Sequence, residues 1–457
     1  MLSEKIINFC KRAEAFSFYG LIFFFPLSIA FSEVFATFTL VFFFVKRWTI
    51  FIKVFSTGGR VKKVFFAFLE IVKPVKSPLS HPLGFFILVC GAFIFFSQYP
   101  SLSIKGFFFK VLQWTYLYFV FIEFMTEKRQ IKIFMNVFLV SMAVVFLNGL
   151  FQYFFGKDLI FGEVYVDRLY SCLRHANDFG AYLVITCPVI LSAVFFQDFS
   201  KKSIDHKETI FKVFPGILFV VGYFCLGMTL SRGAWIGFLG AMVFLGYILF
   251  SRRRRTWMMT FFIAIFFFLT FSSVLNNLRG KNLISDSNKS LVETIRDDSL
   301  SSDSDSFPEK VLSMFKKFNG SDRMRYWGQA LRIIKQSPII GNGLNTYTPM
   351  AAKNPMGTGG YPHNCYLQMA AEIGILGLGV FFWVIFALFR SSLKNIPKMK
   401  DPFLLCVVIG LLSGLFGFLI HASLDTILYS VQLGNLMWVV MGVIVASQQI
   451  DLAAQKS

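Results

Sequence analysis

Two arginines and one histidine are notable because each interrupts or borders apolar sequence. Arg232 lies in TLSRGAWIG between two nearly continuous apolar runs, Arg323 opens SDRMRYWGQALRIIK, and His363 precedes another long apolar run. A guanidinium can bind phosphate through two parallel hydrogen bonds, and an imidazole can accept a proton near neutral pH. The alternatives are an interfacial arginine that contacts lipid phosphates and solvated charges on a helix.

The composition indicates a membrane protein. The 457 residues are 56% hydrophobic and include 62 Phe, and the mean hydropathy is +0.63. Lipid-embedded backbone must pair its hydrogen bonds within each segment, and the apolar runs lack the two-residue alternation of barrel strands. We therefore predict an all-α, polytopic bundle of about twelve transmembrane spans. They are 16–31, 33–45, 83–99, 104–125, 132–154, 176–196, 213–230, 233–250, 257–274, 364–389, 402–420 and 426–447.

Charge alternates between the gaps that separate these spans. The net charge is +20, and the basic clusters fall in every second gap, at 46–82, 128–132, 201–212, 252–255 and 390–400. Basic loops stay in the cytoplasm, so both termini are predicted there, in a bacterial inner membrane. The same rule places Arg232, Arg323 and His363 on the periplasmic side. It also explains the positive charge without nucleic acid.

Three regions follow from the spacing of the spans. Residues 1–274 form an N-terminal bundle of nine spans, and residues 364–457 form the last three. Between them, 275–363 is a periplasmic loop in which Ser- and Asp-rich residues 284–306 are predicted to be flexible. Residues 321–337 are predicted to form an amphipathic helix, which ends at Pro338.

Apolar residues recur along this helix at intervals of three and four. They are Met324, Trp327, Leu331 and Ile334. Arg323 is four residues before Trp327 and shares its face, whereas Arg325 points elsewhere.

A second polar pattern follows His363. Asn364, Gln368 and Glu372 recur every four residues, which predicts one helix face directed at the bundle interior or a wet cavity. Glu372 is the only carboxylate in these motifs, and it lies more than two turns from His363. No CxxC pair occurs, and one Asp-x-Asp sequence lies in the Ser-rich loop at 303–305, so neither a metal nor a cofactor is expected.

The motifs together resemble a known family between Thr229 and about Gly379. His363-Asn364, nine residues and then Gly-x-x-Gly at 374–377 is similar to the signature of the O-antigen ligase and polysaccharide polymerase superfamily. The SRG turn is similar to its arginine loop, and the Arg-x-x-x-Trp helix followed by Pro and Gly-x-Gly resembles its long periplasmic loop. Upstream, Arg168 and the segment His175-Ala176-Asn177 resemble a weaker pattern in which the family often has Pro-Asn.

The resemblance implies an inverting, metal-independent glycosyltransferase of the bacterial inner membrane. Its donor would be a glycan on undecaprenyl pyrophosphate, and its acceptor a hydroxyl of lipid A core, of another glycan or of a protein. His363, Arg232 and Arg323 would be catalytic. The substrate-binding residues would be Arg325, Asn364, Arg168, Arg174 and Asn177. A ligase is favoured over a repeat-unit polymerase. A transporter of lipid-linked saccharides predicts charges near mid-bilayer, and a structural membrane protein leaves the motifs unexplained. Cys172 and Cys365 are both expected near the outer face, and whether they are bridged stays open.

Overall fold

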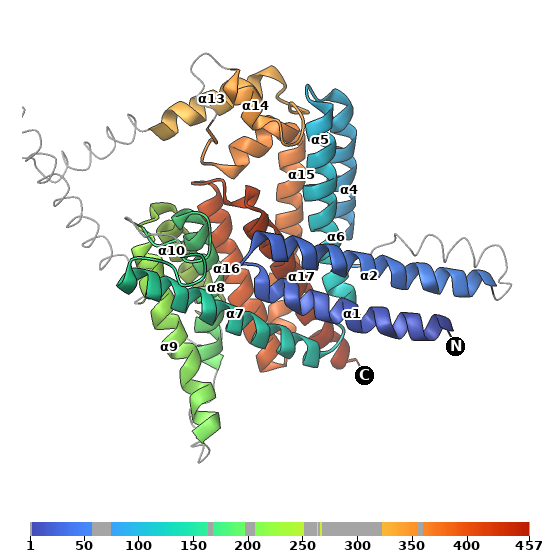
Figure 1. Ribbon diagram of the computed structural model, residues 1–457, viewed down its shortest axis with the longest axis vertical. Helices are drawn as coiled ribbons and strands as arrows, with labels where there is room; N and C mark the ends of the chain where they lie inside the picture. Colours follow the sequence, from blue (N-terminus) through green and yellow to red (C-terminus); the bar gives the residue numbers. More distant parts are fainter. Residues whose placement is uncertain are drawn as a thin grey trace, which may run out of the picture.

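The protein is a helical bundle in the computed structural model (Figure 1). The structure describes residues 2–56, 75–162, 168–196, 206–250, 263, 266, 322–353 and 360–456. Within these residues the regular elements are all helices. The all-α membrane class predicted from the sequence is confirmed.

The elements follow one another along the chain without strands between those described. They are α1 (Leu2–Phe24), α2 (Ile29–Ser56), α4 (Ser80–Ala92), η1 (Phe93–Phe96), α5 (Pro100–Gly106), η2 (Phe107–Leu112), α6 (Gln113–Phe124), α7 (Lys128–Phe155), α8 (Ala176–Phe196), α9 (His206–Met228), α10 (Arg232–Phe250), α13 (Asp322–Gln336), α14 (Tyr347–Ala352), α15 (Cys365–Asn395), η3 (Ile396–Lys398), α16 (Pro402–Ala422), η4 (Ile427–Tyr429) and α17 (Val431–Ala454).

Eight helical stretches in the described residues are long and apolar enough to cross a membrane. Two shorter apolar helices, Ser80–Phe96 and Val213–Met228, occupy further predicted spans. The predicted span 257–274 lies almost wholly outside the described residues. The count of about twelve therefore stays a prediction.

The first two helices form a hairpin whose turn differs from the prediction. α1 ends at Phe24 and α2 begins at Ile29, so the chain reverses at 25–28 and not at Ser32. Pro26 explains the difference, because proline has no N–H to donate and its ring clashes with a preceding helical carbonyl. Figure 1 shows α1 and α2 side by side and inclined across the long axis of the bundle.

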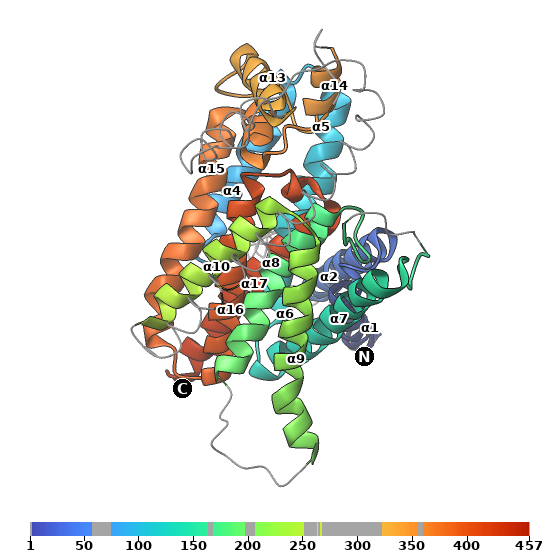
Figure 2. The same ribbon diagram turned by 90° about the vertical axis from the view of Figure 1, so that its left-hand side faces the viewer.

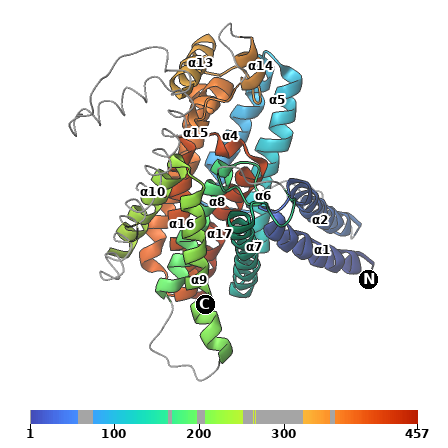
Figure 3. The same cartoon turned by 60° about the vertical axis from the view of Figure 1, so that its left-hand side comes forward.

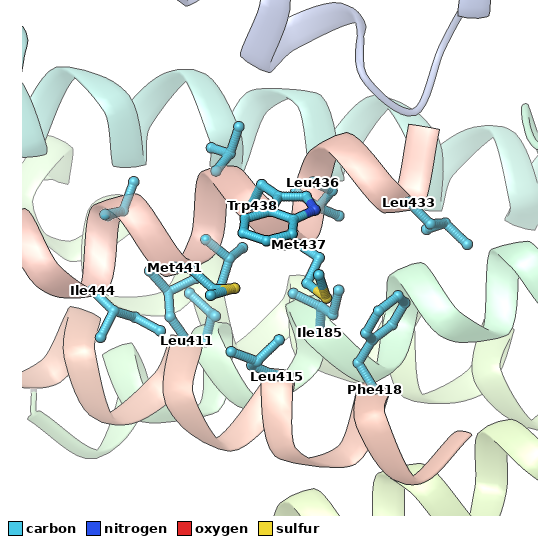
Figure 4. Packing of buried hydrophobic residues seen from close by; sticks show 14 of the residues in the cluster. Ile185, Leu411, Leu415, Phe418, Leu433, Leu436, Met437, Trp438, Met441 and Ile444 are labelled. Atoms are coloured by element: carbon cyan, nitrogen blue, oxygen red, sulfur yellow. The ribbon is translucent and has the colours of Figure 1, made fainter. Parts of the chain in front are cut away.

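The centre of the bundle is built on α16 and α17. α16 packs against α8 and α10, while α17 packs against α6. Small residues allow these close crossings: a Cβ at Gly414 would lie 2.3 Å from Ile185 O, and one at Gly417 would lie 2.4 Å from Gly237 O. Figure 4 shows Trp438 and Met437 of α17 next to Leu415 and Phe418 of α16.

The two ends of the bundle differ in chemistry. At one end Lys128 pairs with Asp401, Gln449 donates to Lys76 O over 3.4 Å, and Gln455 donates to Lys398 O over 3.1 Å. Three predicted basic gaps therefore meet at this end, which we call the basic end. The opposite end, which we call the site end, carries the segments 168–175, 229–232, 360–364 and 423–426, and α13 and α14 lie beyond it (Figures 2 and 3).

A glycine joint attaches the segment after α13 to a break in α15. Gly374 has φ +68° inside α15, and the N–H groups of Ile375 and Leu376 donate to the carbonyls of Pro338 and Ile339 over 2.9 and 3.2 Å. Gly343 N in turn donates to Glu372 O over 2.8 Å. A Cβ on Gly374 would lie 2.1 Å from Ile339 O, so a side chain is excluded there.

The buried face of α13 is not the predicted apolar stripe. Met324 and Leu331 are exposed, whereas Gln329, Ala330 and Ile333 are buried against α14 and α15. The small Ala330 side chain allows close approach of the neighbouring helix, which outweighs the larger side chains of the stripe.

Candidate active site

His363 pairs with an aspartate from a different part of the chain. Its Nδ1 lies 3.0 Å from Asp425 Oδ1, and the two side chains are 40% and 8% exposed. His363 has φ +48° directly before α15, a conformation that is uncommon outside glycine and that turns the residue out of the helix line. Since Nδ1 faces a carboxylate, it carries the proton, and Nε2 is left as the acceptor.

Asp425 is held by partners from three further directions. The N–H of Thr426 donates to Oδ1 over 2.8 Å, and Asn177 Nδ2 donates to Oδ2. The Asp425 carbonyl accepts from the Cys365 thiol over 3.0 Å. Burial raises the pKa of this carboxyl, but the hydrogen bond from His363, the Thr426 N–H and the nearby imidazole outweigh burial and hold the pKa below its usual value. Asp425 is therefore a carboxylate at neutral pH.

Arg168 extends the chain of contacts. Its Nη2 donates to Asn177 Oδ1 over 2.6 Å, and its Nε donates to Thr229 O over 2.8 Å. The result is a continuous polar chain from Arg168 through Asn177 and Asp425 to His363. It ties the loop before α8, the start of α8, the segment after α16 and the start of α15 into one rigid unit.

The two arginines of α13 have different surroundings. Arg323 is half-buried, and its charge acts on Arg168 and on His421. Arg325 is exposed and lies over the Tyr326 ring at 5.6 Å. The Tyr326 ring itself lies 5.7 Å from the His363 ring. Arg323 therefore faces the site, and Arg325 lies at its edge.

Arg232 is the first residue of α10 and its side chain is exposed. It follows Thr229, the acceptor for Arg168, by three residues and so lies at the site end. The next residue must be glycine, because a Cβ on Gly233 would lie 2.7 Å from Cδ2 of His421. His421 is fully buried, which separates it from the accessible His363.

Two predicted substrate-binding residues have other surroundings. Asn364 Oδ1 accepts from the N–H groups of Tyr366 and Leu367, both over 3.0 Å, and thereby caps α15. This structural role was not predicted, and it holds the backbone next to His363. Arg174 is exposed and lines a hollow beside the α1–α2 turn.

The polar face after His363 turns inward as predicted, but it does not reach the imidazole. Gln368 and Glu372 are buried, and Gln368 Nε2 donates to Glu372 Oε1 over 3.3 Å. Glu372 lines an enclosed cavity together with Lys110, whose Nζ donates to Asn345 Oδ1 over 2.7 Å. These residues stabilise the attachment of the 338–347 segment to the bundle.

The seven cysteines are all free, including Cys172 and Cys365, so no bridge joins these two. Burial raises the pKa of the Cys172 thiol to about 11, so the thiol is protonated at neutral pH and is a weak nucleophile. In the described part of the chain, no group of three or more His, Cys, Asp or Glu side chains is placed to hold a metal ion.

Asp425 is the residue that sequence reasoning missed. The motifs contain no carboxylate except Glu372, and Asp425 lies 62 residues after His363 in sequence. The available signal was an acidic residue in a short gap on the predicted outer side, the side of His363.

The comparisons with known proteins agree with this site. The family described as O-antigen ligase matches residues 217–382. The chain carries an O-antigen ligase domain. This confirms the resemblance seen in the sequence motifs, and the matched region includes Arg232, Arg323 and His363. No curated protein matches the chain.

The O-antigen ligase match and the helical fold together establish a multi-pass membrane protein of the ligase and polymerase type, with glycosyl transfer as its general chemistry. Asp425, Asn177 and Arg168 lie outside the matched residues, and only folding brings them to His363.

Proposed function

We propose that the protein transfers a glycan from undecaprenyl pyrophosphate to an acceptor hydroxyl at the periplasmic face of the bacterial inner membrane. The observation that carries this proposal is the His363–Asp425 pair within an O-antigen ligase domain that also contributes two arginines to the same end of the bundle. The acceptor is a hydroxyl of lipid A core, of a glycan or of a protein.

In the proposed reaction, His363 Nε2 takes the proton of the acceptor hydroxyl. The acceptor oxygen forms a bond to the anomeric carbon while the bond from that carbon to the pyrophosphate oxygen breaks, with inversion of configuration. Asp425 does not touch substrate. It holds the proton on Nδ1 and stabilises the imidazolium that forms at 3.0 Å from its carboxylate.

The leaving pyrophosphate gains charge as the bond breaks. Arg232 and Arg323 supply fixed positive charge for it, a role that requires no metal ion. The half-buried position of Arg323 supports this, because screening by water is weaker there than at the exposed Arg325. Arg323→Ala should therefore reduce transfer far more than Arg325→Ala.

The orientation in the membrane rests on the charge pattern, and the contacts among three basic gaps at the basic end support it. An impermeant thiol reagent tests it on two single-cysteine additions at exposed positions, Arg325→Cys and Lys400→Cys. The native cysteines are buried and provide a low background. In intact spheroplasts Arg325→Cys should be labelled and Lys400→Cys should not. The reverse result contradicts the periplasmic site.

Reconstituted transfer tests the function directly. Purified protein in lipid nanodiscs is given a lipid-linked glycan, a candidate acceptor and excess EDTA, and products are separated by size. A single acceptor–glycan conjugate that survives EDTA supports the ligase. A ladder of glycan lengths without acceptor supports the polymerase alternative. A requirement for added Mg²⁺ or Mn²⁺ contradicts the arginine-based mechanism.

A further inference from the structure

A small hollow lies at the site end, outside the polar chain of the site. It has a volume of about 280 Å³ and is bordered by the α1–α2 turn, the loop before α8 and the start of α17. This is near the lower edge of the roughly 300–1,000 Å³ that ligand pockets occupy, and it suits a single ring rather than a long chain.

Gln432 is the first sign that this hollow binds a polar ligand. The residue is 4% exposed and lines the hollow, and among the described residues its amide has no hydrogen-bond partner. A buried amide without a partner is costly, so a partner from outside the protein would stabilise it. An amide can donate and accept at once, as a pair of sugar hydroxyls requires.

The other walls have the chemistry of a saccharide site. Phe161 lines the hollow with a ring that is 55% exposed, and Arg174 and Ser28 add polar groups opposite apolar Leu27 and Ile29. An exposed aromatic ring offers a flat apolar face, and a guanidinium donates several hydrogen bonds in one plane. A sugar ring presents both an apolar C–H face and a rim of hydroxyls.

The hollow is connected to the site through α8. Arg174 acts electrostatically on Asp178, and Asp178 acts on Asp425, the partner of His363. Asn177, the neighbour of Asp178, hydrogen-bonds to Asp425. A glycan that reacts at His363 could therefore extend along the first turn of α8 into the hollow.

We infer that this hollow, lined by Phe161, Arg174 and Gln432, is a binding subsite for one saccharide unit of a glycan substrate. The inference rests on the proposed function, which supplies two glycans, the donor and the acceptor. Both have the same chemistry, and kinetics can distinguish them.

Gln432→Met tests the inference, because it keeps the shape of the side chain and removes the amide. Phe161→Ala and Arg174→Gln are independent second variants. The matched controls are Gln449→Met, on the same helix at the basic end, and Ile160→Ala, which removes an exposed apolar side chain next to Phe161 without altering the hollow. All are compared at equal amounts of folded protein.

Initial rates are measured with each glycan varied at saturating concentration of the other. Loss of one hydrogen-bonding partner should raise one KM about 5- to 30-fold with little change in kcat. A rise in the donor KM assigns the hollow to the donor, and a rise in the acceptor KM assigns it to the acceptor. Unchanged KM values in all three variants overturn the inference.

A binding measurement separates this inference from the proposed function. Free oligosaccharides, released from the lipid-linked glycan or from the acceptor, are titrated by calorimetry into wild type, Gln432→Met and Gln449→Met. Binding that is lost only in Gln432→Met supports the subsite, even if wild type transfers no glycan. Equal binding or no binding in all three proteins refutes the subsite, even if transfer is active.

Discussion

Replacing Asp425 by asparagine tests the central contact of the site. The substitution keeps the size of the side chain, and its Oδ1 can still accept from Thr426 N. It removes the carboxylate 3.0 Å from His363 Nδ1. An amide N–H turned toward Nδ1 would also place the imidazole proton on Nε2, where it blocks acceptance of the substrate proton.

The expected magnitude has two parts. The lost charge-assisted hydrogen bond is worth about 1.5–3 kcal/mol, or roughly 10- to 150-fold in rate. The wrong tautomer removes base function, which contributes about 10²–10⁴ in all. We therefore expect kcat to fall by about 10²–10⁴, with the donor KM nearly unchanged, because Asp425 does not contact the donor.

The assay is single-conjugate formation in nanodiscs, with kcat and both KM values measured for Asp425→Asn, His363→Ala and the double variant. The double variant should be no slower than His363→Ala, because the aspartate acts through the imidazole. Asp178→Asn is the control, since Asp178 is a half-buried carboxylate next to Asn177 with no described hydrogen bond to His363. Wild-type turnover by Asp425→Asn, or additive losses in the double variant, would refute the reasoning.

Three further predictions concern the arginines, the glycine joint and acid. Arg232→Ala and Arg323→Ala should each lower turnover by about 10²–10³, and lysine should restore little because it lacks the planar fork; normal rates in both would place the pyrophosphate elsewhere. Gly374→Ala should lower the melting temperature, since φ +68° alone costs roughly 1–2 kcal/mol and the Cβ would overlap a carbonyl, whereas Gly379→Ala, whose Cβ meets nothing within 4 Å, should not. The pKa of Asp425 is lowered, so its stabilisation is present above the ordinary carboxyl pKa and is lost as the pH falls through the lowered value; the difference in melting temperature between wild type and Asp425→Asn should therefore shrink below about pH 4.

Local patterns were sufficient for the class of protein and for three site residues. Hydropathy is a sum over consecutive residues, so spans such as α8 and α16 were predicted almost to their ends. The first turn was placed wrongly because Pro26 lies inside a run that hydropathy treats as continuous. Arg323 was assigned to the inner side of α13 from helical spacing alone, and it is half-buried there.

The sequence by itself determined the membrane class, the ligase-type motifs and the candidacy of Arg232, Arg323 and His363. Only the tertiary structure decided that Asp425 orients His363, that the Gly-x-Gly and Gly-x-x-Gly motifs form one joint, and that Gln432 meets Phe161 across a hollow. The physical reason is the range of the interactions. Burial and helix periodicity act between neighbours in the chain, whereas these contacts depend on how helices far apart in sequence pack against one another.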